Sequence, residues 1–293
     1  MRIQTLLLAA ICGIAGLTGC RGDRDGGDTA TAGAQRPVDA VLLPARHLRD
    51  DDLVSFVRDS VPAPLHAQLQ QAWSEGRSRW PLEELPLHGQ LPRMIAALSA
   101  PDAETTLLAA FDRQFTGADG ELRKAIETLA AFGVQYVTNN PDLDDIQRDR
   151  EIQRLVALSR WAVQAPLTDR ERARAALATL CAAARATGLD SDAAMGEAGM
   201  DESLRRLSGF LAAVRTVLAG YGLDLDASLA ALEVTLERQT GDHAQLRVRY
   251  PLAGEAIDVR VEIERHGRQW YRSDRLRRAT AAAGRDGASA VPR

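Results

Sequence analysis

Three aromatic residues and five arginines near the C-terminus have the side chains best suited to binding a ligand. Tyr250, Trp270 and Tyr271 fall in segments whose polarity alternates from one residue to the next. On a curved sheet their rings could line a hollow for a small ligand; the alternative is that they seal the sheet against helices. The arginines could receive an acidic partner or an anionic glycan, or form an ordinary solvated face. They are Arg247, Arg249, Arg260, Arg265 and Arg272.

The other residue types that perform chemistry are not arranged for catalysis or metal binding. None of the five histidines is paired at the i, i+4 spacing of a helical metal site. The run Asp142-Leu143-Asp144-Asp145 resembles the start of a calcium loop, but it lacks the loop's glycine and distal glutamate, so a helix N-cap is favoured. Cys181 lies in an apolar helical run and is expected to be a buried, unreactive thiol. We therefore expect no metal, no cofactor and no enzymatic activity.

The first twenty residues have the layout of a secretory signal, with a basic start, a short apolar core and small residues before a cysteine. Arg2 is their only charged residue, and the apolar run 6–14 is shorter than the roughly 20 residues of a membrane span. The ending Leu17-Thr18-Gly19-Cys20 resembles the lipobox of bacterial lipoproteins. That resemblance implies removal of residues 1–19 and lipidation of Cys20, which would anchor the chain to a membrane. An ordinary signal peptide with a chance cysteine is the alternative.

The following segment, residues 20–37, is rich in Gly, Asp and Thr without apolar periodicity, which predicts a flexible tether. In Gram-negative lipoproteins, an aspartate directly after the modified cysteine commonly signals retention in the inner membrane. Arg21 stands there instead, so the resemblance implies the periplasmic face of the outer membrane. The formal net charge is −4, and loss of Arg2 makes it −5 (−4 − 1), which offers no electrostatic attraction for nucleic acid.

Residues 38–230 are expected to be helical, because aromatic residues make up only 4% of the chain while Ala and Leu are abundant. The proline-rich stretch 77–92 is expected to be irregular, with Trp80 packed against the core. Thr168 and Glu171 have the spacing of a capping box, and Gly188 suits the end of the helix that they begin. Apolar spacing predicts one helix or two short ones over 38–61, and further helices over 65–73, 93–99, 102–115, 120–137, 144–165, 168–187 and 201–220.

At about Ala231 the apolar period changes from 3.6 residues to 2. Four alternating segments separated by turns predict an antiparallel four-stranded meander over residues 231–274, with one face buried. The fold class is therefore expected to be α+β, with a mainly helical body packed on a C-terminal sheet. The tail, residues 275–293, is basic and then rich in Ala and Gly, and it is predicted to be disordered.

The closing Gly267-Arg268-Gln269-Trp270-Tyr271 resembles the last strands of NTF2-like (cystatin-like) domains, in which helices pack into the hollow of a curved sheet. The overall layout also resembles lipoproteins of Xanthomonas-type bacteria, a family that implies no activity. We expect a non-enzymatic scaffold or partner-binding module, tethered to the outer membrane and bound to an envelope protein. The alternatives are a small-ligand carrier or sensor that uses an NTF2-like hollow, and an envelope enzyme whose polar groups meet only on folding.

Overall fold

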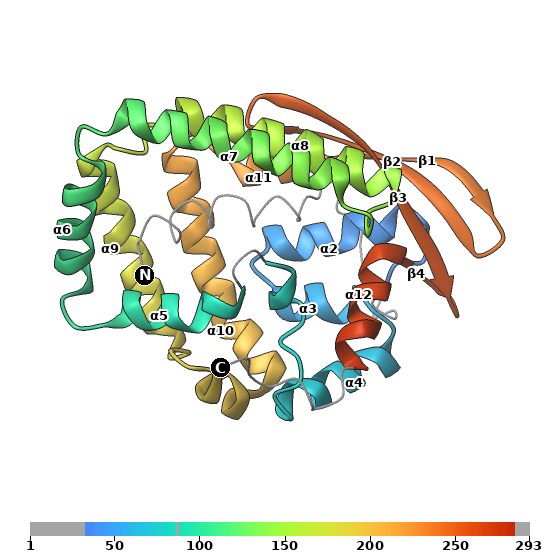
Figure 1. Cartoon of the computed structure of the whole chain (residues 1–293). Helices are drawn as coiled ribbons and strands as arrows, with labels where there is room; N and C mark the ends of the chain where they lie inside the picture. Colours follow the sequence, from blue (N-terminus) through green and yellow to red (C-terminus); the bar gives the residue numbers. More distant parts are fainter. Residues whose placement is uncertain (1–32, 86–87, 285–293) are drawn as a thin grey trace.

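Helices make up most of the molecule, and strands near the C-terminus form an antiparallel sheet (Figure 1). A computed structural model describes residues 33–85 and 88–284. Its α-helices are α2 (Asp39–Arg49), α3 (Leu53–Arg58), α4 (Ala63–Ser74), α5 (Leu91–Ser99), α6 (Ala103–Phe115), α7 (Asp119–Asn139), α8 (Asp145–Gln164), α9 (Arg170–Thr187), α10 (Asp192–Gly220), α11 (Leu225–Ala230) and α12 (Ser273–Ala283). Its 3-10 helices and strands are η2 (Leu82–Glu84), η3 (His88–Gln90), β1 (Glu233–Thr240), β2 (His243–Leu252), β3 (Glu255–His266) and β4 (Gln269–Arg272). The predicted α+β class is confirmed.

The strands follow one another in the order β1-β2-β3-β4, each antiparallel to its neighbour, which confirms the predicted meander. Alternate residues of β2 and β3 are buried, as the period of 2 predicted. On the other face Arg247 lies opposite Arg260, where like charges would repel. Each instead pairs with a carboxylate: Arg247 Nη2 lies 2.5 Å from Asp258, and Arg260 Nε lies 2.9 Å from Glu237.

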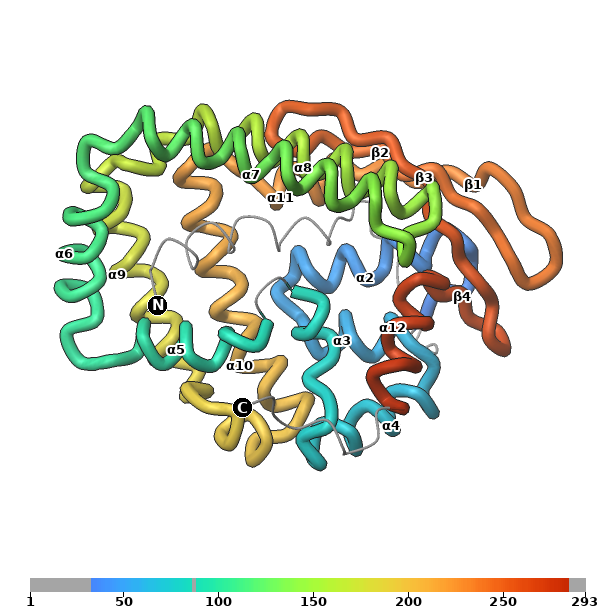
Figure 2. The backbone as a smooth tube through the Cα atoms, in the orientation of Figure 1, coloured from blue at the N-terminus to red at the C-terminus, as the bar shows by residue number. Residues whose placement is uncertain are grey.

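The buried face of the sheet packs against α2, α8 and α11, and these elements enclose one core cluster. Leu158 and Trp161 of α8 and Leu225 of α11 are buried there against strand residues such as Leu246 and Val259. α7 lies along α8, and Figure 2 shows the two helices running side by side. α8 therefore separates α7 from the sheet.

A second core cluster lies where α3, α4, α5, α9, α10 and α12 meet. Trp73 of α4 is fully buried in it, and its Nε1 donates a hydrogen bond to the carbonyl oxygen of Met195 in α10 (3.0 Å). Trp80, in the proline-rich stretch, is buried in the same cluster, and its Nε1 donates to Glu84 (2.8 Å). The prediction that Trp80 packs this stretch against the core is confirmed.

The ends of α8 and α9 agree with the sequence except at one cap. Asp144 caps α8 by accepting a hydrogen bond from a backbone N–H (2.8 Å), and Gly188, with φ of 59°, ends α9 in the left-handed region. The predicted capping box at Thr168 is wrong, because Asp169 caps α9 instead. The hydroxyl of Thr168 donates to Asp119 at the start of α7, so it links two helices.

α10 begins at Asp192, where Ser191 provides the N-cap, and its part after Gly199 corresponds to the helix predicted over 201–220. Gly199 has non-helical backbone angles (φ 76°, ψ 174°), so α10 consists of two helices that meet at a kink there. Glycine adopts such a positive φ without the strain that other residues would suffer.

The prediction of a disordered tail over 275–293 is wrong for its first part. Residues Ser273–Ala283 form α12, and Leu276, Ala279 and Ala282 on one face of this helix are buried in the second core cluster. Arginines lie between these apolar residues in the sequence, so the apolar face of the helix was not recognised from the sequence. The rest of the predicted tail lies outside the described residues.

The predicted tether over 20–37 also ends earlier than expected. Ala34 is buried, and its carbonyl oxygen accepts a hydrogen bond from the backbone N–H of Trp270 in β4 (2.8 Å). Arg36 pairs with Asp39 at the start of α2 (2.8 Å). The chain therefore belongs to the fold from Ala34 onward, whereas residues 1–32, with the signal segment and Cys20, lie outside the described residues.

Candidate functional site

The three aromatic residues predicted to line a ligand hollow are core residues in the structure. Tyr250, Trp270 and Tyr271 are all buried, and the adjacent residues Trp270 and Tyr271 belong to different core clusters. The hydroxyl of Tyr250 accepts a hydrogen bond from Nε of Arg154 on α8 (3.0 Å). These side chains therefore join the sheet to the helices, which is the packing alternative that the sequence left open.

Four of the five sheet arginines lie on the solvent side of the sheet. Each lies beside a carboxylate, in the pairs Arg247–Asp258, Arg249–Glu233, Arg260–Glu237 and Arg265–Asp242. Because their charges are balanced one for one, these pairs favour the solvated face over a site for an acidic partner. Arg272 differs from the other four: its side chain is largely buried and points to α12.

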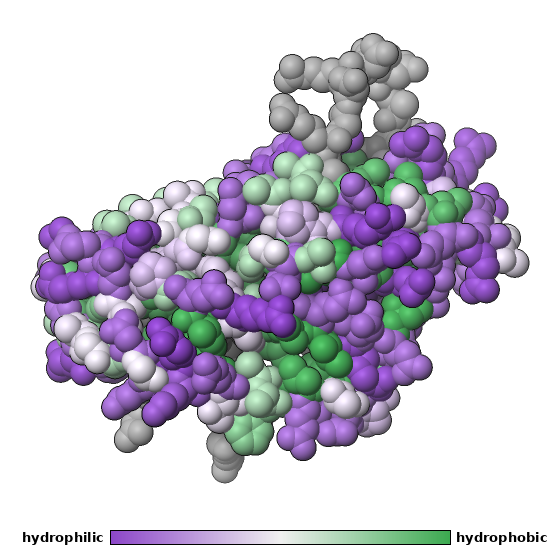
Figure 3. Space-filling view, turned by 90° about the horizontal axis from the view of Figure 1, so that it is seen from above, coloured by the Kyte–Doolittle hydropathy of each residue, from purple (hydrophilic) through white to green (hydrophobic). Residues whose placement is uncertain are grey.

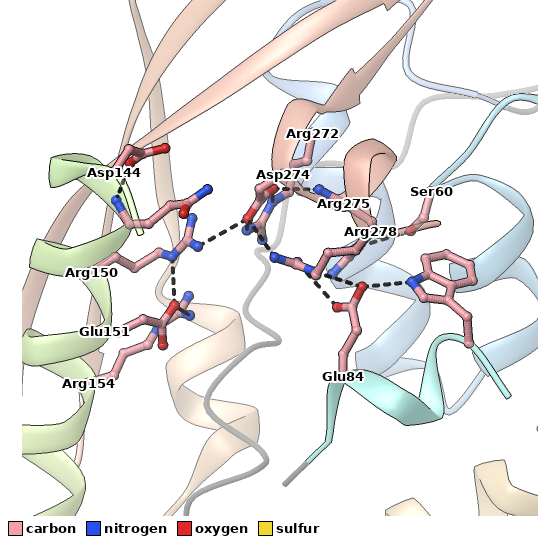
Figure 4. Close-up of polar contacts among 12 residues, drawn as sticks. Ser60, Glu84, Asp144, Arg150, Glu151, Arg154, Arg272, Asp274, Arg275 and Arg278 are labelled. Atoms are coloured by element: carbon pink, nitrogen blue, oxygen red, sulfur yellow. Dashed lines mark hydrogen bonds and ion pairs between the residues drawn. The ribbon is translucent and has the colours of Figure 1, made fainter. Parts of the chain in front are cut away.

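Arginines and carboxylates from four elements form a connected polar network between α8 and α12 (Figure 4). Figure 4 shows the α8 side chains on one side of the network, facing those of α12 and η2 on the other. The arginine network, as we call it, consists of Arg150, Glu151 and Arg154 of α8, Arg272 of β4, Asp274, Arg275 and Arg278 of α12, and Glu84 of η2.

Asp274 lies at the centre of the arginine network. Its buried carboxylate is 3.1 Å from Arg150 Nη2, 2.7 Å from Arg272 Nη2 and 3.6 Å from Arg278 Nη1. Burial by itself would raise the pKa of the Asp274 carboxyl, but Arg272 and Arg150 together hold this pKa well below its usual range. Asp274 is therefore ionised at neutral pH and joins α8, β4 and α12.

Two further carboxylates lie at the ends of the network. Glu151 Oε1 is 3.1 Å from Arg150 Nε and 3.4 Å from Arg154 Nη1. Glu84 Oε1 is 3.0 Å from Arg278 Nε. Burial would raise the pKa of Glu84, but nearby arginines outweigh burial and lower this pKa, so Glu84 also stays ionised.

Arg275 is the member of the network with no ion-pair partner among the described residues. It is 5% exposed, its Nη1 donates to the hydroxyl of Ser60 (3.0 Å), and its guanidinium lies 4.6 Å from the ring centroid of Phe56. Its Nε has no hydrogen-bond partner in the part of the chain that the structure describes. Burial and the neighbouring Arg272 lower the pKa of Arg275 to about 10, so the side chain keeps its charge at neutral pH.

A second feature lies on the outer surface, where α7 carries three large apolar side chains at i, i+3 and i+7 spacing. This α7 stripe consists of Leu129, Phe132 and Tyr136, which are 51%, 64% and 72% exposed. The structure describes all 21 residues of α7, and Ile126 is the only buried residue among them. α7 packs on α8 near Gly133, where an added Cβ would lie 2.8 Å from Leu155. The stripe therefore lies outside the contact between the two helices.

An open pocket of about 470 Å³ lies beside the C-terminal half of the α7 stripe. Figure 3 views the molecule from above and shows hydrophobic residues at the surface among hydrophilic ones. Aromatic rings and side-chain amides meet in this pocket, so it can hold an apolar side chain and hydrogen-bond to polar groups beside it. The lining residues are Phe132, Gln135, Tyr136, Asn139, Asn140, Pro141 and Asp142.

The other residues whose side chains could be reactive or bind a metal pack in the fold or form ion pairs within it. Cys181 is fully buried, as predicted, and burial raises the pKa of its thiol. His47 Nε2 lies 2.8 Å from Asp59 at the end of α3. Within residues 33–85 and 88–284, no three metal-ligating side chains are grouped and no helix has the length and apolar composition of a membrane span. The lipidation of Cys20 stays a prediction, because this residue lies outside those ranges.

No family model, no curated protein and no solved structure matches this chain. The lipoprotein and NTF2-like resemblances therefore stay predictions. The features available for inferring a function are the α7 stripe with its pocket and the arginine network.

Proposed function

We propose that the protein is a lipid-anchored scaffold on the periplasmic face of the outer membrane that binds an envelope protein through the α7 stripe. The observation that carries this proposal is the exposure of three large apolar side chains along one helix. Contiguous apolar patches on soluble proteins mark interaction sites when they exceed scattered single residues. The lipobox-like ending at Cys20 would supply the anchor.

The partner that fits the stripe is an amphipathic helix of another protein. The stripe covers the eight residues 129–136 of the helix, about 10 Å from end to end, which matches two turns of a helix laid alongside it. Aromatic anchors seated next to a pocket are typical of the residues that dominate binding energy. Gln135 and Asn139 line the pocket beside the rings, where their amides can hydrogen-bond to polar groups of the partner.

The charges of α7 favour a protein over the lipid surface itself. The helix carries Asp119, Glu121 and Glu127 against Arg123 and Lys124, a net charge of −1 (2 − 3). Helices that lie on lipid surfaces are instead rich in Lys and Arg on their polar face. The partner helix is therefore expected to place basic residues beside its apolar face.

Lys124, the only lysine in the chain, allows a direct test. It precedes Leu129 by five residues on α7, so an amine-reactive crosslinker added to intact cells will capture a protein that lies against the stripe. We expect one dominant partner, crosslinked at the edge of an amphipathic helix. Combining Phe132→Ser with Tyr136→Ser should lower its recovery about tenfold or more, because hot-spot residues each contribute about 2 kcal/mol or more.

Two control variants separate the stripe from general surface effects. Leu236→Ser removes a comparably exposed apolar side chain (46%) from β1 and should leave the crosslinked yield unchanged. Lys124→Arg with Arg260→Lys moves the lysine to the solvent face of the sheet and should abolish capture of this partner. An unchanged yield in the Phe132→Ser, Tyr136→Ser variant would refute the α7 stripe as the binding surface.

A further inference from the structure

The arginine network contains more positive charge than its own carboxylates neutralise. Among the described residues it has five guanidinium groups and three carboxylates, a surplus of two positive charges (5 − 3). Buried charge is costly unless it is paired, and arginine does not relieve this cost by losing its proton at neutral pH. An anion from outside the network would therefore be strongly stabilised there.

Arg275 marks the position at which such an anion would bind. The residue is 5% exposed, and the acceptor of its Nη1 is the neutral hydroxyl of Ser60. The carboxylates near it, Glu84 and Asp274, are already held by other arginines. Its Nε finds no acceptor within the described ranges. Arg79, Arg148 and Arg215 also have an Nε without a hydrogen-bond partner, but Arg275 differs because its side chain is buried and lacks an ion pair among the described residues. A buried charged group of this kind calls for a ligand, ion or water to complete it.

We propose that the arginine network is an anion site that binds a phosphate group in its dianionic form through the guanidinium groups of Arg275 and Arg278. The surplus of two positive charges matches a dianion, whereas a monocarboxylate would neutralise half of it. The planar guanidinium fork also matches pairs of phosphate oxygens. Inorganic phosphate and phosphate monoesters share this chemistry.

The network is open to solvent at Arg278, whose side chain is 44% exposed. Arg275 and Arg278 are three residues apart on α12, so they lie on one side of the helix, and Figure 4 shows both near Glu84. An anion that displaces the Arg278–Glu84 pair (3.0 Å) would enter the network from this side, next to Arg275. The long, flexible Arg278 side chain would then close over the bound anion.

Titration calorimetry of the purified full chain with sodium phosphate, compared with sodium chloride at equal ionic strength, tests this site. We expect saturable binding whose affinity rises as the pH passes about 6 to 7, because phosphate then gains its second negative charge. Sulfate, which is dianionic throughout this range, should bind with an affinity that does not change in this way. Arg275→Gln should weaken phosphate binding about tenfold or more, because it removes charge-assisted hydrogen bonds.

Arg278→Gln alters an exposed side chain, so it tests the site even if Arg275→Gln does not fold. This variant should weaken phosphate binding by a similar factor. Arg260→Gln, on the solvent face of the sheet, is the matched control and should leave the affinity unchanged. Glycerol phosphate distinguishes the source of the ligand: tighter binding than inorganic phosphate indicates a phosphate ester, and weaker binding indicates the free anion. The absence of saturable binding by both ligands, or equal affinities in Arg278→Gln, Arg260→Gln and the unaltered protein, would overturn the proposal.

Discussion

The guanidinium group of Arg150 on α8 lies 3.1 Å from the carboxylate of Asp274 on α12, and both side chains are buried. α8 packs on the sheet in one core cluster, whereas α12 packs on α4 in the other. This ion pair therefore connects the two core clusters. Because neither group is well solvated, removal of Asp274 leaves Arg150 and Arg272 in a poorly solvated place without their shared carboxylate, and Arg150 then has only Glu151 as an ion-pair partner among the described residues.

Asp274→Asn should lower the free energy of unfolding by about 3–5 kcal/mol, the cost typical of breaking a buried ion pair from one side. The asparagine keeps the size of the side chain but leaves Arg150 and Arg272 without their shared carboxylate. Urea unfolding followed by circular dichroism measures the difference. Asp242→Asn, which removes the partner of exposed Arg265, should cost less than about 1 kcal/mol. Equal losses in the two variants would contradict a central role for Asp274.

Asp274 should also make the protein sensitive to acid. The pKa of its carboxyl is lower in the folded chain than in the unfolded chain, so the unfolded chain binds protons first as the pH falls. The stabilisation is complete above the unfolded pKa of about 3.9 and is lost progressively as the pH falls below it toward the folded pKa. Thermal unfolding between pH 7 and pH 2 should show this loss. The melting temperature should fall less steeply with decreasing pH in Asp274→Asn than in the unaltered protein. An identical dependence on pH would assign the acid sensitivity to other carboxyls.

β2 and β3 could be predicted from the sequence because both alternate between apolar and polar residues and end at turn residues, whereas burial does not alternate in β1 and β4. Alternation is a local signal, and it is clear in β2 and β3 because one face of these strands is buried along most of its length. α12 has no such signal, because Arg277 and Arg278 separate Leu276 from Ala279. The composition of this segment is therefore that of a basic, disordered tail. Burial of α12 depends on partners in α4 that lie about 200 residues earlier in the chain.

The two candidate sites could not be predicted for different physical reasons. Asp274 and Arg150 lie far apart in the sequence, and the tertiary fold brings them together. The local spacing of residues therefore cannot predict this ion pair. On α7, Leu129 and Phe132 have the same helical periodicity as the buried Ile126. The pattern therefore identifies an apolar helix but does not distinguish which of its residues a neighbour covers. That distinction depends on α8, which contacts the side of the helix near Gly133.

Leu276→Ala should test whether α12 belongs to the folded core in solution. The side chain is 5% exposed in the second core cluster, and truncation of a buried leucine typically costs about 2–5 kcal/mol through lost burial and the cavity left behind. Arg277→Ala, at an exposed position on the same helix, should change stability by no more than about 0.5 kcal/mol. Chemical denaturation of both variants measures the contrast, and a Leu276→Ala protein as stable as the Arg277→Ala protein would restore the prediction of a disordered tail.

Val259→Asp should destabilise the sheet by several kcal/mol. Val259 is 2% exposed and lies opposite Val248, so the new carboxylate would be buried without a partner or forced to take up a proton. Leu236→Asp introduces the same charge at an exposed position of β1 and should shift the melting temperature only slightly. Differential scanning calorimetry of the two variants tests whether this face of the sheet is buried at Val259. Equal losses in the two variants would contradict the burial of Val259 in the core.

Cys20→Ser should abolish the membrane anchor on which the scaffold proposal depends. Several acyl chains, each contributing about 0.8 kcal/mol per buried CH₂, bind a protein stably to a bilayer, whereas a serine at this position offers no thiol for acylation. Cells grown with radiolabelled palmitate should incorporate label into the unaltered protein and into Cys181→Ser, but not into Cys20→Ser. After cell fractionation, the unaltered protein is expected with the outer membrane. Label retained by Cys20→Ser would show that the chain is acylated at another position and would refute Cys20 as the lipidation site, and the α7 stripe would then have to be tested without this anchor.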